Sequence, residues 1–132
     1  MVLMVTRALE VELISRVMDV PLNELAECLR NNNLSAEDVE NLENMFNEDQ
    51  TSREYSSNFG CFVTCVFEKS NIIQNNEIQL DRLIALAKRN KFNITAAIKQ
   101  KLNECINEAE EEDDKCKIGL VFTSCVMRKL RQ

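Results

Sequence analysis

Apolar residues recur at three- and four-residue steps along most of the chain, which is the pattern of amphipathic helices. The pattern predicts one helix in each of the segments 3–19, 35–46, 58–70, 80–89, 93–109 and 114–128, with a further one or two turns over residues 22–29 after Pro21. The polar segments 47–57, 71–77 and 110–114 are expected to be loops. The hydrophobic pattern therefore indicates an all-α fold.

The segment 58–70 is the most apolar of these helices, and we expect it to be buried on most sides. Composition supports the same fold class, since the 132 residues include only 2 Gly and 1 Pro, too few for the turns of a β-rich fold. A chain of this length is expected to form a single domain with one core, over residues 1–132.

Charge and missing residue types exclude several classes of function. The net charge of −6 disfavours nucleic-acid binding, which needs an excess of Lys and Arg. There is no His, the commonest general base, and no Gly-rich phosphate loop, so we do not expect an enzyme. Without a CxxC pair or His, a zinc site is disfavoured and no cofactor is expected. No apolar run is long enough to cross a membrane.

The six cysteines are Cys28, Cys61, Cys65, Cys105, Cys116 and Cys125. An even number of cysteines in a small chain is typical of a disulfide framework formed in an oxidising compartment, which predicts a secreted protein. Cys61 and Cys65 share one helix face, so they are expected to bond to two different segments. Cys116 and Cys125 face opposite sides of the last helix and also need separate partners. These two constraints leave several connectivities open.

The spacing of the six cysteines resembles that of insect odorant-binding proteins, in the pheromone-binding and general odorant-binding group. Its most specific parts are the three residues between Cys61 and Cys65, the eight between Cys116 and Cys125, and the stretch 113–116. The resemblance extends over roughly residues 5–128. It implies a compact bundle of about six helices around an apolar cavity that holds one small hydrophobic molecule. The disulfide pairing that it implies is Cys28–Cys65, Cys61–Cys116 and Cys105–Cys125.

The resemblance also implies which residues bind the ligand. They are Val17, Met45, Phe46, Val63, Val66, Phe67, Ile73, Leu83, Leu86, Ile98, Leu102, Phe122 and Val126. Ordinary core packing is the alternative role for each, because periodicity does not separate a filled core from a cavity. Moth pheromone carriers often have a hydroxyl where this chain has Phe67, which favours a more apolar wall here. Thr64 is the nearest hydroxyl, and its alternative role is a bond to a backbone carbonyl one turn back.

The predicted function is that of a secreted, extracellular carrier in sensory lymph or haemolymph, which binds odorants or pheromones in an internal apolar pocket. Its expected partners are a small hydrophobic ligand, volatile or lipid-like, and a membrane odorant receptor. Neither nucleic acid nor membrane insertion is expected, and the chain is predicted to be a monomer or a weak homodimer. One alternative is a carrier of non-olfactory lipophiles from the same family. Another is a disulfide-linked signalling or interaction protein without a cavity.

The ends of the chain and its two sequons add smaller expectations. The apolar stretch 1–5 is too short for a signal peptide, so a mature secreted chain is expected. Seven residues follow Cys125, and the chain has no His, so no tail-driven ligand release at mildly acidic pH is expected. The sequons at Asn33 and Asn93 lie at predicted helix starts, where capping is the expected role and glycosylation the alternative.

Overall fold

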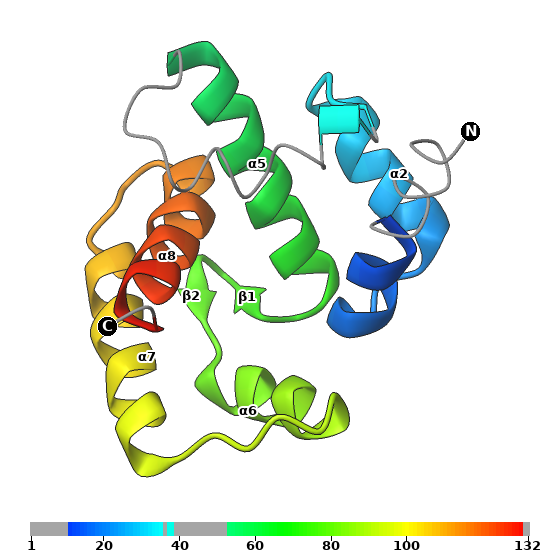
Figure 1. Cartoon of the computed structure of the whole chain (residues 1–132). Helices are drawn as coiled ribbons and strands as arrows, with labels where there is room; N and C mark the ends of the chain where they lie inside the picture. Colours follow the sequence, from blue (N-terminus) through cyan, green and yellow to red (C-terminus); the bar gives the residue numbers. More distant parts are fainter. Residues whose placement is uncertain (1–10, 36, 39–52, 131–132) are drawn as a thin grey trace.

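The computed structural model describes residues 11–35, 37–38 and 53–130, and its elements confirm the predicted all-α class (Figure 1). Residues 11–18 are helical, and the other helices are α2 (Leu22–Asn31), α5 (Arg53–Lys69), α6 (Leu80–Arg89), α7 (Ala96–Glu110) and α8 (Lys115–Leu130). Two short strands, β1 (Ile73–Gln74) and β2 (Glu77–Ile78), lie between α5 and α6.

Helix boundaries follow the hydrophobic pattern best in the C-terminal half of the chain. Helix α6 coincides with the predicted segment 80–89, and α7 begins directly after Thr95, whose hydroxyl oxygen accepts a hydrogen bond from the N–H of Ile98. The predicted loop over 47–57 is wrong for residues 53–57, which form the first turns of α5. This stretch is mostly polar, so it carries no apolar stripe that would reveal a helix.

Two parts of the predicted pattern lie largely outside the described residues. Of the predicted helix over 35–46, only residues 35 and 37–38 are described, and residues 37–38 are helical. Residues 3–10 of the first predicted helix are also outside, so the structure tests that helix only over residues 11–18.

The predicted loop over 71–77 contains a small antiparallel hairpin. Ile73 pairs with Ile78 across it, and both side chains are buried. The two turn residues, Asn75 and Asn76, have φ of 54° and 64°. Two successive positive φ values are what a two-residue hairpin turn of type I′ requires, and Asn tolerates them better than most residues. The low glycine content therefore did not exclude this one hairpin.

Four helical segments end in the same way, with a non-glycine residue in the left-handed conformation. These residues are Asp19, Asn33, Asn71 and Lys91, with φ of 57°, 56°, 67° and 62°. The residue after each donates its N–H to the carbonyl five positions back, as in the Schellman motif (Val20, Leu34, Ile72 and Phe92). Val20, Leu34 and Ile72 are buried, so an apolar side chain anchors three of these helix ends in the core.

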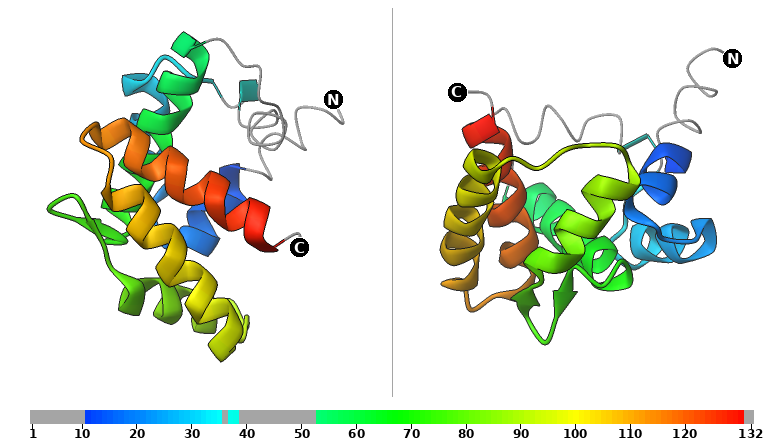
Figure 2. Two further views of the ribbon diagram at one scale, coloured as in Figure 1. Left: turned by 90° about the vertical axis from the view of Figure 1, so that its left-hand side faces the viewer. Right: turned by 90° about the horizontal axis from the view of Figure 1, so that it is seen from below.

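Three disulfides join the helices, and their pairing is the one that the family resemblance implied. The bond Cys28–Cys65 joins α2 to α5, Cys61–Cys116 joins α5 to α8, and Cys105–Cys125 joins α7 to α8, with Cα–Cα distances of 5.8, 4.2 and 5.5 Å. No cysteine is free. Figure 2 shows that α7, which the bond Cys105–Cys125 joins to α8, runs beside that helix.

Both glycines of the chain lie where α5 meets α8. A Cβ on Gly60 would lie 2.5 Å from the backbone oxygen of Cys116, and one on Gly119 would lie 2.8 Å from the backbone nitrogen of Thr64. The absence of a side chain at both positions therefore allows the two helices to approach this closely. The Thr64 hydroxyl adds a polar link, since it donates to the Lys115 carbonyl at 2.9 Å and accepts from the Gly119 N–H at 3.1 Å.

Buried apolar residues form two clusters that meet at Met18 and Phe67. The first cluster is built mainly from the segment 20–34 and from α5. The second is built from the hairpin, α6, α7 and α8. Met18 and Phe67 are partly buried and pack against both clusters, so the boundary between the clusters runs past these two side chains.

Candidate functional site

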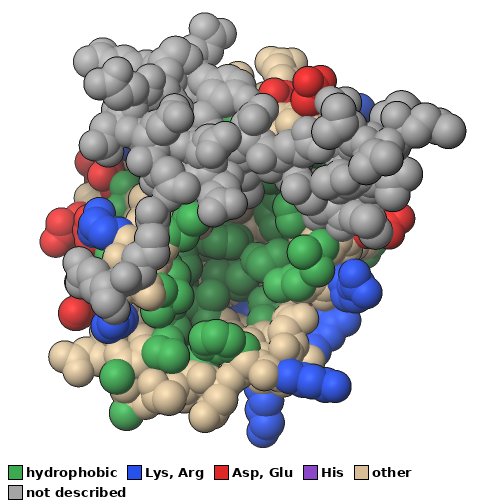
Figure 3. All heavy atoms as spheres, viewed as in Figure 1, with side chains coloured by type: hydrophobic (Ala, Val, Ile, Leu, Met, Phe, Trp, Pro, Cys, Tyr) green, Lys and Arg blue, Asp and Glu red, His purple; other side chains and the backbone are tan. Residues whose placement is uncertain are grey.

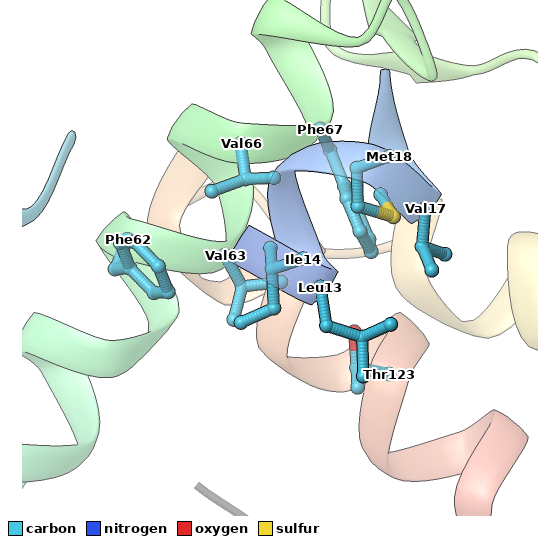
Figure 4. Close-up of a pocket in the computed structure, with 9 residues that line it drawn as sticks. All are labelled: Leu13, Ile14, Val17, Met18, Phe62, Val63, Val66, Phe67 and Thr123. Atoms are coloured by element: carbon cyan, nitrogen blue, oxygen red, sulfur yellow. The ribbon is translucent and has the colours of Figure 1, made fainter. Parts of the chain in front are cut away.

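An apolar hollow of about 280 Å³ lies where the two clusters meet. Its lining residues come from the helical segment 11–18, α5 and α8, and are Leu13, Ile14, Val17, Met18, Phe62, Val63, Val66, Phe67 and Thr123. Figure 3 shows hydrophobic side chains gathered in a hollow near the centre of one face, and Figure 4 shows how the nine lining residues surround the space. Among the described residues of this lining, only Thr123 has a polar side chain.

One wall of the hollow is the apolar face of α5. Phe62, Val63 and Val66 are buried, with 2%, 6% and 4% of their surface exposed. Residues three and four positions apart lie side by side on a helix, so Val63 is a neighbour of both Val66 and Phe67, and Val66 is a neighbour of Phe62. The four side chains therefore form a continuous surface. The cysteines at 61 and 65 lie among them and bond to α8 and α2, which fixes this wall on both sides.

The opposite wall is the helical segment 11–18. Its spacing of three and four residues places Leu13 and Val17 together, and Ile14 and Met18 beside them. Leu13 is 50% exposed and Val17 is 36% exposed. Apolar surface that remains in contact with water at the edge of a hollow is surface that a hydrophobic ligand can bury.

Polar contacts at the end of segment 11–18 hold this wall against α6. The Asn90 side chain donates a hydrogen bond to the Val17 carbonyl at 3.0 Å. The Asp19 carboxylate lies 2.8 Å from Nη1 of Arg89 and 3.2 Å from Nη2 of Arg82. Arg82 also donates from Nε to the Ser70 carbonyl at 2.7 Å, so it connects segment 11–18, α6 and the end of α5.

These arginines change the titration of Asp19. Its hydrogen bond with Arg89, followed by that with Arg82, lowers the pKa of the Asp19 carboxyl below its usual value of 3.8. The carboxylate therefore stays ionised, and both contacts persist, down to about pH 4.

An aromatic contact joins the hollow to the second cluster. The rings of Phe67 and Phe122 meet edge to face, with centroids 6.0 Å apart and an interplanar angle of 76°. Phe122 is buried and belongs to the second cluster. This contact therefore packs the Phe67 ring, which lines the hollow, against a core residue of α8.

The structure divides the predicted ligand-binding residues into two groups. Val17, Val63, Val66 and Phe67 line the hollow. The other described residues are buried in the second cluster or packed against it, and are Ile73, Leu83, Leu86, Ile98, Leu102, Phe122 and Val126. Met45 and Phe46 lie outside the described residues. A ligand role for any of these residues stays a prediction.

Five lining residues were not predicted as ligand contacts, namely Leu13, Ile14, Met18, Phe62 and Thr123. Leu13 and Met18 are among the apolar residues of the segment 3–19, and Phe62 is among those of the segment 58–70, so the pattern that predicted the two helices includes them. Thr123 gave only a weak signal, because a single hydroxyl beside Phe122 is common in any helix.

The two threonines near the hollow differ in their hydrogen bonding. Thr64 is 2% exposed, and its hydroxyl bonds to backbone groups of α8 rather than one turn back on its own helix. The buried Oγ1 of Thr123 has no hydrogen-bond partner within the described part of the chain. The Thr123 oxygen is itself buried, so it presents almost no polar surface to the hollow.

Within the ranges that the structure describes, no three His, Cys, Asp or Glu side chains are grouped so that they could hold a metal ion. In the same ranges, no helix combines the length and the hydrophobicity needed to cross a membrane. The described residues around the hollow therefore offer almost purely apolar contact.

Comparison with known proteins gives a family for this combination of helices, disulfides and hollow. Residues 21–129 match the sequence profile of the PBP/GOBP family. The chain belongs to the PBP/GOBP family. This PBP/GOBP chain is also 23% identical to general odorant-binding protein 57c of Drosophila melanogaster over 112 residues, which is 83% of this chain and 72% of that protein. No solved structure matches it significantly.

Proposed function

We propose that this PBP/GOBP protein is a secreted, extracellular carrier that binds one small hydrophobic molecule, an odorant or pheromone, in the hollow between segment 11–18 and α5. Family membership supports the class of function. The observation that carries the choice of site is the continuous apolar lining, in which the described residues include one hydroxyl and no charged side chain. The three disulfides support an oxidising, extracellular location.

The volume of the hollow limits the size of the ligand. A cavity of about 150 Å³ holds benzene. The hollow has a volume of about 280 Å³, so it suits a molecule of on the order of a dozen non-hydrogen atoms. Binding would remove the exposed parts of Leu13 and Val17 from water, at roughly 25 cal/mol per Å² of apolar surface buried.

A charge placed in the hollow tests the site. Leu13→Asp adds a carboxylate to the lining, and an ionised group facing an apolar ligand without a partner is costly. We expect the affinity for a fluorescent apolar probe, measured by titration, to fall roughly tenfold or more. Displacement of the probe by medium-chain or aromatic volatiles then reports the ligand class.

Leu22→Asp is the matched control, because Leu22 is 48% exposed against 50% for Leu13 and does not line the hollow. It should keep the wild-type affinity. If both variants reduced the probe affinity equally, the ligand could not be assigned to the hollow. A folded wild-type protein that binds no apolar probe would contradict the carrier function and favour an interaction protein with a solid core.

A further inference from the structure

Positive charge is concentrated in one part of this acidic chain. Residues 82–103 contain six Lys and Arg and no Asp or Glu, whereas the rest of the chain contains ten Lys and Arg and all 22 Asp and Glu. The segment comprises most of α6, the loop after it and the first half of α7. Figure 3 shows Lys and Arg side chains gathered at the lower right, the side on which α6 ends in Figure 1. Such a concentration of one charge attracts anions.

Part of this charge is used inside the fold, and part is not. Arg82 and Arg89 pair with Asp19. Lys88 and Lys91 are exposed, and within the described ranges no carboxylate pairs with either of them. A lysine near the last turn also offsets the partial negative charge of the helix end. That role leaves both ammonium groups open to an external anion.

The apolar residue at the end of α6 stays exposed. In each of the three other helix ends with the same backbone geometry, the apolar residue after the left-handed position is buried. At the end of α6 the left-handed residue is Lys91, and the next residue, Phe92, donates its N–H to the Ala87 carbonyl at 2.8 Å. Yet 51% of the Phe92 surface remains exposed. Phe92 therefore presents apolar surface that a ligand can bury.

A second hollow, of about 410 Å³, lies at this helix end, and we call it the α6 hollow. Its lining residues are Ile84, Lys88, Lys91, Phe92, Asn93 and Ile94. Among the described residues, none lines both this hollow and the one between segment 11–18 and α5. The α6 hollow thus combines three apolar side chains with two cations, whereas the described lining of the first hollow carries no charge.

We propose that the α6 hollow binds a small amphiphile with a carboxylate head and a short hydrocarbon chain. The ammonium groups of Lys88 and Lys91 pair with the carboxylate, as charge-assisted hydrogen bonds. The hydrocarbon chain covers Phe92, Ile84 and Ile94 and removes their apolar surface from water. This site goes beyond the proposed carrier function, because it takes the anionic ligands that an uncharged apolar lining disfavours.

The test follows the backbone amide signals of the full chain by NMR while a ligand is added. Decanoate is compared with decanol, which has the same hydrocarbon chain and no charge. We expect decanoate to shift the amides of residues 84–94, and decanol to do so roughly threefold to tenfold more weakly, the range of two exposed ion pairs. Added salt should weaken the binding of decanoate but not that of decanol.

Two double variants separate this site from a general effect of charge. Lys88→Gln with Lys91→Gln removes both cations of the α6 hollow, and decanoate binding there should weaken roughly threefold to tenfold. Lys99→Gln with Lys117→Gln removes the same charge at exposed positions that do not line the hollow, and it should keep wild-type binding. Affinity for the fluorescent apolar probe, which reports the first hollow, should be unchanged in both.

Three results would overturn the α6 site. The first is an equal loss of decanoate binding in the two double variants. The second is a set of decanoate-induced shifts confined to segment 11–18 and α5. The third is a response of residues 84–94 to vesicles of phosphatidylserine and phosphatidylcholine but not to free decanoate, which would make this region a membrane contact. None of the three affects the carrier function, which fails only if the apolar probe does not bind.

Discussion

The two walls of the hollow are held in place by different kinds of bond. The α5 wall carries two cysteines, and its disulfides to α2 and α8 fix it from both sides. Segment 11–18 contains no cysteine, and the ion pairs of Asp19 and the hydrogen bond from Asn90 join it to α6. Covalent links thus hold the buried wall, whereas noncovalent contacts hold the half-exposed one, namely these polar bonds and the packing of Val11, Ile14 and Met18 against the first cluster.

The two kinds of attachment differ in strength. The closing of loops of 37 and 55 residues by disulfides contributes about 4 kcal/mol each in the chain-entropy treatment. Exposed ion pairs contribute far less and weaken with salt. We therefore expect segment 11–18, with the flexible side chain of Met18, to adjust to the ligand while α5 keeps its place.

Removal of the disulfide between α5 and α8 should have the largest effect. In the double variant Cys61→Ala with Cys116→Ala, we expect the free energy of unfolding to fall by about 4 kcal/mol, because the unfolded chain gains the freedom of a 55-residue loop. Denaturant unfolding measures this, and probe binding should weaken together with stability. A double variant with an unchanged unfolding midpoint would show that noncovalent packing alone fixes the α5 wall.

A methyl group at the contact between α5 and α8 should have an intermediate effect. In Gly119→Ala the new Cβ would lie 2.8 Å from the Thr64 nitrogen and 3.1 Å from its Cα, so the helices must separate. We expect a loss of about 1–3 kcal/mol, as for other overpacked sites. Lys117→Ala, at an exposed position of the same helix, should change stability by less than about 0.5 kcal/mol. Equal effects of the two variants would contradict the close-contact role of Gly119.

The smallest effect is expected from Asp19→Asn, which removes the ion pairs that hold the adjustable wall. Global stability should barely change, and probe affinity should weaken less than in Leu13→Asp. Asp81→Asn, at an exposed carboxylate in the first turn of α6, is the control and should keep wild-type affinity.

The same aspartate predicts how binding depends on pH. The pKa of Asp19 is lowered in the folded protein. The ion pairs of its carboxylate therefore contribute to the stability of the folded state above the unfolded-state pKa near 3.8, and this contribution is lost as the pH falls through the lower folded-state pKa. Wild-type affinity should thus stay flat from pH 7 to about 5 and decline below about pH 4, a decline that is reduced in Asp19→Asn. A tenfold loss of affinity between pH 7 and 5.5 would contradict this.

Hydrophobic periodicity predicted most helices of the described chain, and the cysteine spacing predicted the disulfides through the family resemblance. The analysis of hydrophobic pattern and glycine content did not predict the hairpin, because Asn75 and Asn76 occupy the turn positions where glycine is usual. Periodicity identifies side chains that face inward, but not whether they meet other side chains or an empty space. Val63 and Leu102 are both buried, yet only Val63 lines the hollow, since this depends on how the helices are placed in three dimensions.

The glycine at position 60 also has a consequence for oxidative folding. It precedes Cys61 and allows α5 to approach the Cys116 backbone, where the two cysteines reach a Cα–Cα distance of 4.2 Å. A side chain at this position would hold the correct sulfur partners apart, while Cys65 on the same helix face remains available to compete for Cys116. We therefore expect Gly60 to favour correct disulfide pairing, and Gly60→Ala to yield more mispaired protein in non-reducing peptide maps.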